Sequence, residues 1–175
     1  ESDRGPAMAD RAYNAIVFGE DHPYGRSTSG TSEEVETLTR DDVITFWKTW
    51  YRPNNATLVI VGDLSVADAV ARATRVFGGW ARASVPVLAK STPAPARATT
   101  IYIIDKPKAP QTSFRLGGIG VARNTKDYYP LMVMNTALGG SFTSRLNQNL
   151  RETKGYTYGA SSGFAMRREP GSFTA

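Results

Sequence analysis

The sequence contains no cysteine and only one histidine, His22, among its 175 residues. These shortages exclude disulfides, thiolate nucleophiles and Cys-ligated metals within this chain. They also exclude any metal site that needs two imidazoles, including the usual ligand set of a catalytic zinc. Long apolar runs are missing as well. The longest, such as Ala56–Val61, are as short as a strand. A membrane-spanning helix needs about 20 apolar residues, so we expect no membrane insertion.

The charge is modestly positive and spread along the chain. There are 21 Lys and Arg against 16 Asp and Glu, which gives a net charge of +5. The tightest basic group, Arg167–Arg168, is followed at once by Glu169. No basic stripe with interleaved aromatics is present, so we expect no nucleic-acid partner and interpret the charge as a solubility feature.

Hydrophobic periodicity predicts an α+β chain made of two unequal lobes. Residues 81–98, which contain Pro86 and Pro93 among Ala and Ser, lose this periodicity and predict a Pro/Ala-rich extended linker. Helices are predicted over 7–18, from Thr39 to Pro53, from Ser65 to Gly78, over 127–138 and over 142–153. Strands are predicted over 56–62, 99–105, 111–118 and 156–164, with 171–175 as the hairpin partner of the last one.

Three motifs have both a functional and a plain structural interpretation. His22 lies in a turn-rich HPYGR segment, and we favour a locally hydrogen-bonded turn over catalysis. The carboxylates of Glu33 and Glu36 would share a helix face that could bind a hard cation, but a solvated helix start with Glu34 is the favoured interpretation. The glycine-rich residues 117–120 resemble a phosphate loop yet lack the Lys-Ser/Thr pair, so we favour a turn.

Residues 138–159 (LGGSFTSRLNQNLRETKGYTYG) give a stronger indication of function than these three motifs. Arg151 stands near the end of a short helix, and Tyr158 follows seven residues later, after a reversal at Gly155. A guanidinium and a phenol that converge there would hold a carbonyl oxygen and stabilise an oxyanion. The alternative is that Arg151 caps the helix C-terminus and that Tyr158 belongs to the core of a strand.

Together with HPYGR, the segment YRPNNATLVIVGD and the QTSF strand, residues 138–159 resemble the pitrilysin/insulinase family of zinc metallopeptidases, which includes the mitochondrial processing peptidase. The resemblance covers about 150 of the 175 residues, in the family's order. It implies a two-layer α/β sandwich with a mixed sheet packed by helices. It also implies a substrate-facing loop at Gly139, Gly140, Ser141 and Phe142, beside the pair Arg151 and Tyr158.

The chain departs from the family's pattern because it has no His-x-x-Glu-His zinc motif. Glu1 stands a few residues too late to be the distal zinc ligand. The resemblance therefore implies the end of one repeat in residues 1–80, the linker 81–98, and the start of the next, zinc-less repeat in residues 99–175. Because Gly171–Ala175 reads like a strand cut in the middle, we expect a fragment of a longer protein.

The resemblance implies a non-zinc-binding domain of a metallopeptidase that helps to bind extended peptides. No residue of this chain is expected to bind a metal. Zinc is expected in the parent protein or in a partner subunit that closes with this chain as a clamshell. Alone, the chain is expected to be inactive. A non-catalytic peptide-binding or scaffold subunit is the alternative. The periplasm is the expected compartment, with the cytoplasm as the alternative.

Overall fold

The computed structural model describes residues 4–89, 91–93 and 98–175. The chain forms two compact units: unit 1 is Glu1–Ser29 with Ser91–Ala175, and unit 2 is Gly30–Lys90. Part of the predicted linker, residues 90 and 94–97, and the predicted role of Glu1 lie outside the described residues. The predicted repeats 1–80 and 99–175 are defined by common ancestry, which contacts within the structure do not test. Their boundary therefore stays a prediction.

Unit 2 consists of short helices with well-formed N-terminal caps. Thr39 caps α3, where its hydroxyl accepts a hydrogen bond from Asp42 N at 3.3 Å and donates one to Asp42 Oδ2 at 2.6 Å. The hydroxyl and the backbone N–H of Thr39 hold the pKa of Asp42 below its ordinary value. The elements are α2 (Ser32–Thr37), α3 (Arg40–Trp50), the 3₁₀ turn η1 (Pro53–Asn55) and α4 (Val66–Phe77). The helices predicted from Thr39 and Ser65 are confirmed.

Glu34 forms part of a helix N-terminal cap, as Asp42 does, and not of a cation site. Its carboxylate Oε2 accepts a hydrogen bond from Thr31 N at 2.8 Å, and its N–H donates to the Thr31 hydroxyl at 3.2 Å. This capping box starts α2, with Glu33 and Glu34 in the first turn. The interpretation of the acidic cluster as a solvated helix start is therefore confirmed.

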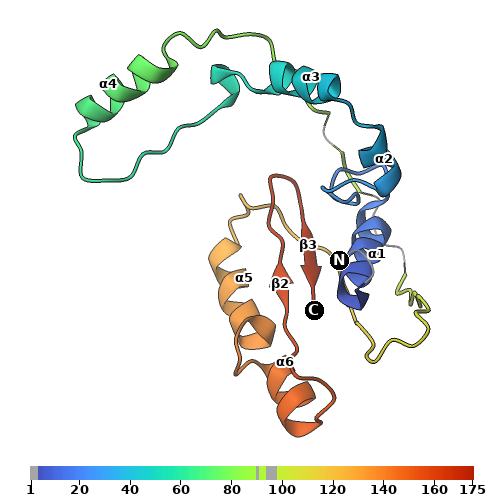
Figure 1. Ribbon diagram of the computed structural model, residues 1–175. Helices are drawn as coiled ribbons and strands as arrows, with labels where there is room; N and C mark the ends of the chain where they lie inside the picture. The colour runs from blue at the N-terminus through green and yellow to red at the C-terminus, as the bar shows by residue number, and fades with distance from the viewer. Residues whose placement is uncertain (1–3, 90, 94–97) are drawn as a thin grey trace. The chain divides into compact units, whose positions relative to one another are not determined.

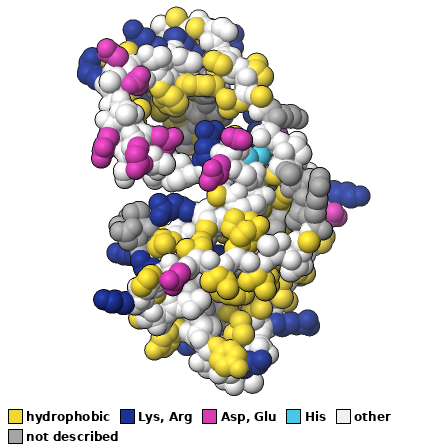
Figure 2. Space-filling model, turned by 90° about the vertical axis from the view of Figure 1, so that its right-hand side faces the viewer, with side chains coloured by type: hydrophobic (Ala, Val, Ile, Leu, Met, Phe, Trp, Pro, Cys, Tyr) yellow, Lys and Arg dark blue, Asp and Glu magenta, His cyan; other side chains and the backbone are white. Residues whose placement is uncertain are grey.

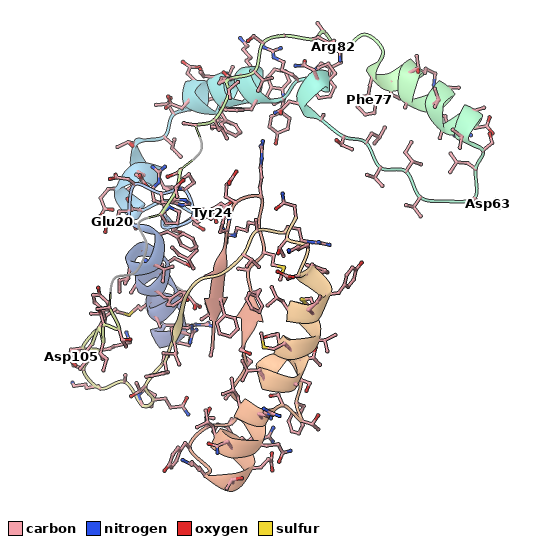
Figure 3. The ribbon with its side chains drawn as sticks, turned by 180° about the vertical axis from the view of Figure 1, so that it is seen from behind. Glu20, Tyr24, Asp63, Phe77, Arg82 and Asp105 are labelled. Atoms are coloured by element: carbon pink, nitrogen blue, oxygen red, sulfur yellow. The ribbon has the colours of Figure 1, made fainter. Side chains whose placement is uncertain are left out.

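The strand predicted over 56–62 is wrong for the described structure. The segment is irregular, and Val59 and Val61 are 77% and 92% exposed. Figure 3 shows its side chains on both sides of the chain that leads to Asp63. The strand predicted over 99–105, in unit 1, fails in the same way, with Ile103 89% exposed. A strand needs a neighbour for its N–H and C=O groups, and an apolar pattern does not specify that neighbour.

Unit 1 contains a three-stranded antiparallel sheet in the order β1-β3-β2. Phe173 of β3 pairs with Gly118 of β1 and with Phe164 of β2. The strands are β1 (Gly117–Ile119), β2 (Gly163–Phe164) and β3 (Ser172–Thr174). The α+β class and the C-terminal hairpin are confirmed. The strands are shorter than predicted, because residues 111–116 and 156–162 are irregular. The mixed sheet and the two-layer sandwich stay predictions.

The glycine-rich residues 117–119 form β1 rather than a turn, so the favoured interpretation of this motif is wrong. A Cβ at Gly117 would overlap the backbone oxygen of Phe173, and the Tyr13 hydroxyl would lie 2.6 Å from it. Glycine is therefore needed there because two neighbours approach the backbone closely. The motif serves the sheet, and no phosphate-binding geometry results.

The helices α5 and α6, each continued by a π-helical segment, complete unit 1 near its C-terminal hairpin. Figure 1 shows β2 and β3 between α1 and α5. The predicted helix over 142–153 begins later, at Arg145, because Ser144 holds the N-cap conformation. Phe142 therefore precedes the helix. The elements are α1 (Gly5–Phe18), α5 (Tyr128–Asn135), the π-helical η2 (Thr136–Gly140), α6 (Arg145–Asn147) and the π-helical η3 (Gln148–Thr153).

Burial in the described residues is mostly polar. Phe18 is the buried hydrophobic side chain, at 6% exposure. The buried polar residues are His22, Asn135, Ser144, Asn147, Ser162 and Ser172. Figure 2 shows many hydrophobic side chains on the surface of one face. In the described part, no helix has the length and apolar character needed to cross a membrane.

His22 occupies a buried turn after α1 and is fully engaged there. Its Nδ1 accepts a hydrogen bond from Tyr24 N at 3.0 Å, so Nε2 carries the proton and donates to Ser91 O at 3.0 Å. Its ring stacks on Phe18, with a centroid distance of 5.2 Å. Tyr24, labelled in Figure 3, accepts a hydrogen bond from Glu169 N at 3.3 Å. The interpretation of His22 as a turn residue is confirmed.

Tyr13 connects α1 to the sheet. Its hydroxyl donates to the backbone oxygen of Phe173 at 2.6 Å, in the middle of β3. Nearby, Arg115 Nε lies 2.6 Å from Asp10 Oδ1, which joins α1 to the chain that enters β1. These two contacts hold unit 1 together across more than one hundred residues of sequence, since they join positions 105 and 160 residues apart.

We predict that Tyr13→Phe lowers the free energy of unfolding of unit 1 by about 1 kcal/mol, the net value of one such hydrogen bond. The loss arises because the Phe173 carbonyl keeps its partly buried position without its donor. Urea unfolding measures it. Tyr129→Phe is the control, since the Tyr129 side chain is 76% exposed. Equal effects of the two substitutions would contradict the assignment.

We predict a pH dependence with a definite sign from the same residue. Burial raises the pKa of Tyr13 above its ordinary value, because it disfavours the phenolate. The stabilisation is complete below the pKa of an unfolded tyrosine, about 10. It is lost as the pH rises through the higher folded pKa. The difference in unfolding free energy between the wild type and Tyr13→Phe should therefore shrink in strong alkali. A constant difference up to about pH 12 would contradict the prediction.

Candidate functional site

An open depression of about 350 Å³ lies on unit 1, between the C-terminal helical segments and the chain that enters β2. It contains all six residues predicted for the site. Its lining is Gly139, Gly140, Ser141, Phe142, Asn147, Arg151, Tyr158, Gly159, Ala160 and Ser161. Its volume falls at the lower end of the range of roughly 300–1,000 Å³ for ligand sites.

The first wall is the C-terminal end of η2 together with the loop that follows it. Gly139 O accepts a hydrogen bond from Ser162 N at 3.0 Å, which joins this loop to the chain before β2. Asn135 reinforces the contact: its Nδ2 donates to Ser162 O at 3.0 Å, and its Oδ1 accepts from the Ser162 hydroxyl at 2.8 Å. Asn135 and Ser162 are 7% and 8% exposed, so both ends of this contact are buried.

The second wall contains the positively charged side chain of Arg151. The Arg151 guanidinium lies over the Phe142 ring, 4.4 Å from its centroid, and its Nε is 3.3 Å from Glu152 Oε1. Stacking on the ring fixes the guanidinium plane, while the ion pair uses Nε alone among its five N–H donors. No residue that lines the depression is acidic, so Arg151 gives it a positive character.

Tyr158 lies at the open side of the depression. Its side chain is 88% exposed, so the alternative that it is a core residue of a strand is wrong. The chain around it is a turn, in which the Thr157 hydroxyl donates to Gly159 O at 2.9 Å and accepts from Gly159 N at 3.2 Å. The phenol is therefore presented to solvent, and its residue lines the same depression as Arg151.

Sequence reasoning missed Asn147 and the chain 159–161, which also line the depression. Asn147 is 3% exposed and lies at the end of α6, one helical turn before Arg151. Its signal in the sequence is an asparagine beside Leu146, inside a helical pattern that asparagine disfavours. The wide turns η2 and η3 were missed as well, although such turns occur frequently at functional sites.

The described residues do not fit a zinc ion. No group of three or more His, Asp or Glu among them is arranged to hold a metal. Both ring nitrogens of His22 are already engaged in hydrogen bonds. A zinc site needs about four N, O or S ligands in tetrahedral geometry, so this part of the chain supplies no such site.

The family described as the Peptidase M16 inactive domain matches residues 37–175. The chain belongs to this family of zinc-protease-like proteins, and the predicted pitrilysin-type resemblance is confirmed. An uncharacterized zinc protease of Mycobacterium leprae is 30% identical over 181 residues, which cover 99% of this chain and 39% of that protein. A second uncharacterized zinc protease, from Streptomyces coelicolor, is 30% identical over 94% of this chain and 37% of its own length.

Solved structures agree with this assignment. The peptidase M16 inactive domain from Pseudomonas fluorescens has a TM-score of 0.88 and 32% identity, and covers 99% of this chain and 41% of that one. A protease from Helicobacter pylori has a TM-score of 0.80 at 18% identity, covers 96% of this chain and 41% of its own, and supports the fold alone. The chain thus spans about two fifths of the length of these relatives.

We predict that Gly139→Ala destabilises unit 1 by about 1–3 kcal/mol, as overpacking typically does. An added Cβ would overlap the backbone nitrogen of Ser162, which cannot swing away as a side-chain end can. Thermal or urea unfolding measures the loss. Gly118→Ala is the matched control, because nothing lies within 4 Å of its Cβ position. Two equal losses would show that the close approach at Gly139 is not the cause.

Proposed function

We propose that this chain supplies the substrate-binding, non-zinc half of a metallopeptidase. In that function, Arg151 and Tyr158 hold the carbonyl oxygen of the peptide bond to be cleaved. The observation that carries the proposal is that both side chains line one depression together with Gly139–Phe142. The zinc would be held by another domain of the parent protein or by a partner subunit, as the names of the relatives suggest.

The chemistry of the depression suits an extended peptide. Gly139 and Gly140 present only backbone to the depression, because Ser162 and Asn135 fill the positions where their Cβ atoms would stand. The guanidinium of Arg151 is a permanent cation with donors that match a carbonyl oxygen. The exposed phenol of Tyr158 adds a neutral donor. Donors aimed at developing negative charge stabilise it most when they are held in place beforehand, as the Phe142 ring holds the guanidinium.

The fold proposal extends beyond the antiparallel sheet of unit 1. We propose that this sheet belongs to a mixed sheet packed by helices in a two-layer α/β sandwich. The exposed valine and isoleucine side chains of the described chain support this, because a packed layer would remove them from costly contact with water. Residues 1–80 would end one repeat and 99–175 would begin the next, on either side of the linker 81–98.

A clamshell of two such halves would close around the peptide, and the zinc-bearing half would be the partner of this chain. We place the parent protein in the periplasm, with the cytoplasm as the alternative, since a chain without cysteine suits either compartment. Fractionation of cells that express the parent protein tests the compartment.

The proposal is tested with Arg151→Ala and Tyr158→Phe in the full zinc-bearing protein or assembly. Loss of one oxyanion donor typically costs about 2.7–4 kcal/mol, so each variant should lose roughly a hundred- to a thousandfold in peptide kcat/KM. Arg145→Ala and Tyr156→Phe are matched controls, because both residues are exposed and neither lines the depression. Unchanged kcat/KM in both test variants would leave the alternative, a non-catalytic peptide-binding or scaffold subunit.

A further inference from the structure

Asn147 is a buried amide that uses both of its polar ends. It is 3% exposed, and its Nδ2 donates to Phe142 O at 2.7 Å. Its Oδ1 accepts from Ala160 N at 3.1 Å. A buried amide without such partners would be costly, so these two bonds account for its presence inside the helical segment. The same side chain also lines the depression.

The two partners of Asn147 belong to the two parts of the chain that carry the proposed site. Phe142 is the ring under the Arg151 guanidinium, and Ala160 follows Tyr158 by two residues. Asn147 itself lies four residues before Arg151 on the helical segment α6–η3. One side chain therefore joins the loop, the helix and the tyrosine-bearing turn.

The turn with Tyr158 depends on this contact for its position. Tyr156 N donates to Leu150 O at 2.9 Å, and Ser162 N donates to Gly139 O at 3.0 Å. Between these two anchors, the bond from Ala160 N to Asn147 attaches the described chain to the helix. The 88% exposed Tyr158 side chain gains no packing that would hold it otherwise.

We propose that Asn147 is a positioning residue that sets the placement of Tyr158 and of the Arg151–Phe142 stack relative to each other. This inference rests on the proposed function. Only an amide of this length offers a donor for Phe142 O and an acceptor for Ala160 N on one rigid plane. Aspartate keeps the acceptor and sets a carboxylate against the carbonyl of Phe142. Alanine leaves both backbone groups unpaired.

The test compares Asn147→Ala and Asn147→Asp with the wild type in the full zinc-bearing protein. A small misplacement of catalytic groups costs up to about a hundredfold in rate, so we expect kcat to fall tenfold to a hundredfold. KM should stay within about twofold, because Arg151, Tyr158 and the segment Gly139–Phe142 are unchanged. The effects of Asn147→Ala and Tyr158→Phe should be far from additive, since both remove the same placed donor.

Two controls separate positioning from folding. Asn149→Ala removes an exposed amide from the same helical segment and should leave kcat unchanged. Tyr13→Phe lowers stability through a contact outside the depression. If Asn147→Ala loses activity only in proportion to its unfolded fraction, as Tyr13→Phe does, the proposal is overturned. A rise in KM at constant kcat also overturns it.

Hydrogen exchange on the same full protein distinguishes failure of this inference from failure of the proposed function. The amides of residues 158–160 should exchange faster in Asn147→Ala than in the wild type or in Asn149→Ala. If they do, while Arg151→Ala and Tyr158→Phe keep full activity, the proposed function has failed and Asn147 holds a non-catalytic turn. Unchanged exchange at these amides overturns the placement by Asn147 itself.

Discussion

Buried side-chain amides determine the shape of the candidate site. In most domains, apolar burial positions the functional groups, but here Phe18 is the buried hydrophobic residue of the described chain. Asn135 and Asn147 instead fix the walls of the depression through hydrogen bonds of 2.7–3.1 Å to backbone and side-chain partners. Hydrogen bonds are directional, so they specify relative position more sharply than apolar contact does. In the proposed function, which needs two donors on one oxygen, this directionality would set the relative position of the donors.

Close approach and polar contacts also join other parts of unit 1. The loop at Gly139 approaches Ser162 so closely that a side chain at Gly139 is excluded. That approach lets Asn135 reach the Ser162 carbonyl and hydroxyl. At the other end of unit 1, Tyr13 and the Asp10–Arg115 pair attach α1 to the sheet that carries the same hairpin. The depression therefore lies in a region whose parts are joined by polar contacts between residues distant in sequence.

Local signals predicted those elements that local chemistry determines. Thr39 with Asp42, and Ser65 with Asp68, start helices because their caps need only neighbouring residues. The strands at 56–62 and 99–105 needed partners, which no local pattern supplies. Arg151 and Tyr158 were predicted from residue type and spacing as well as from the resemblance, and the four loop residues 139–142 from the resemblance alone. All six line one depression. Asn147 could not be predicted in the same way, because its role depends on Phe142 and Ala160, which approach it only after folding.

The chain combines exposed apolar segments with a polar depression. It spans about two fifths of the length of its relatives, and Val59 and Ile103, at 77% and 89% exposure, form part of its exposed apolar surface. The depression does not depend on that surface, because its hydrogen bonds close within residues 135–162. In the proposed function, as the substrate-binding half of a two-part enzyme, the chain would keep its recognition groups in place while the halves separate to admit a peptide. Its exposed apolar side chains would supply free energy for joining the rest of the protein.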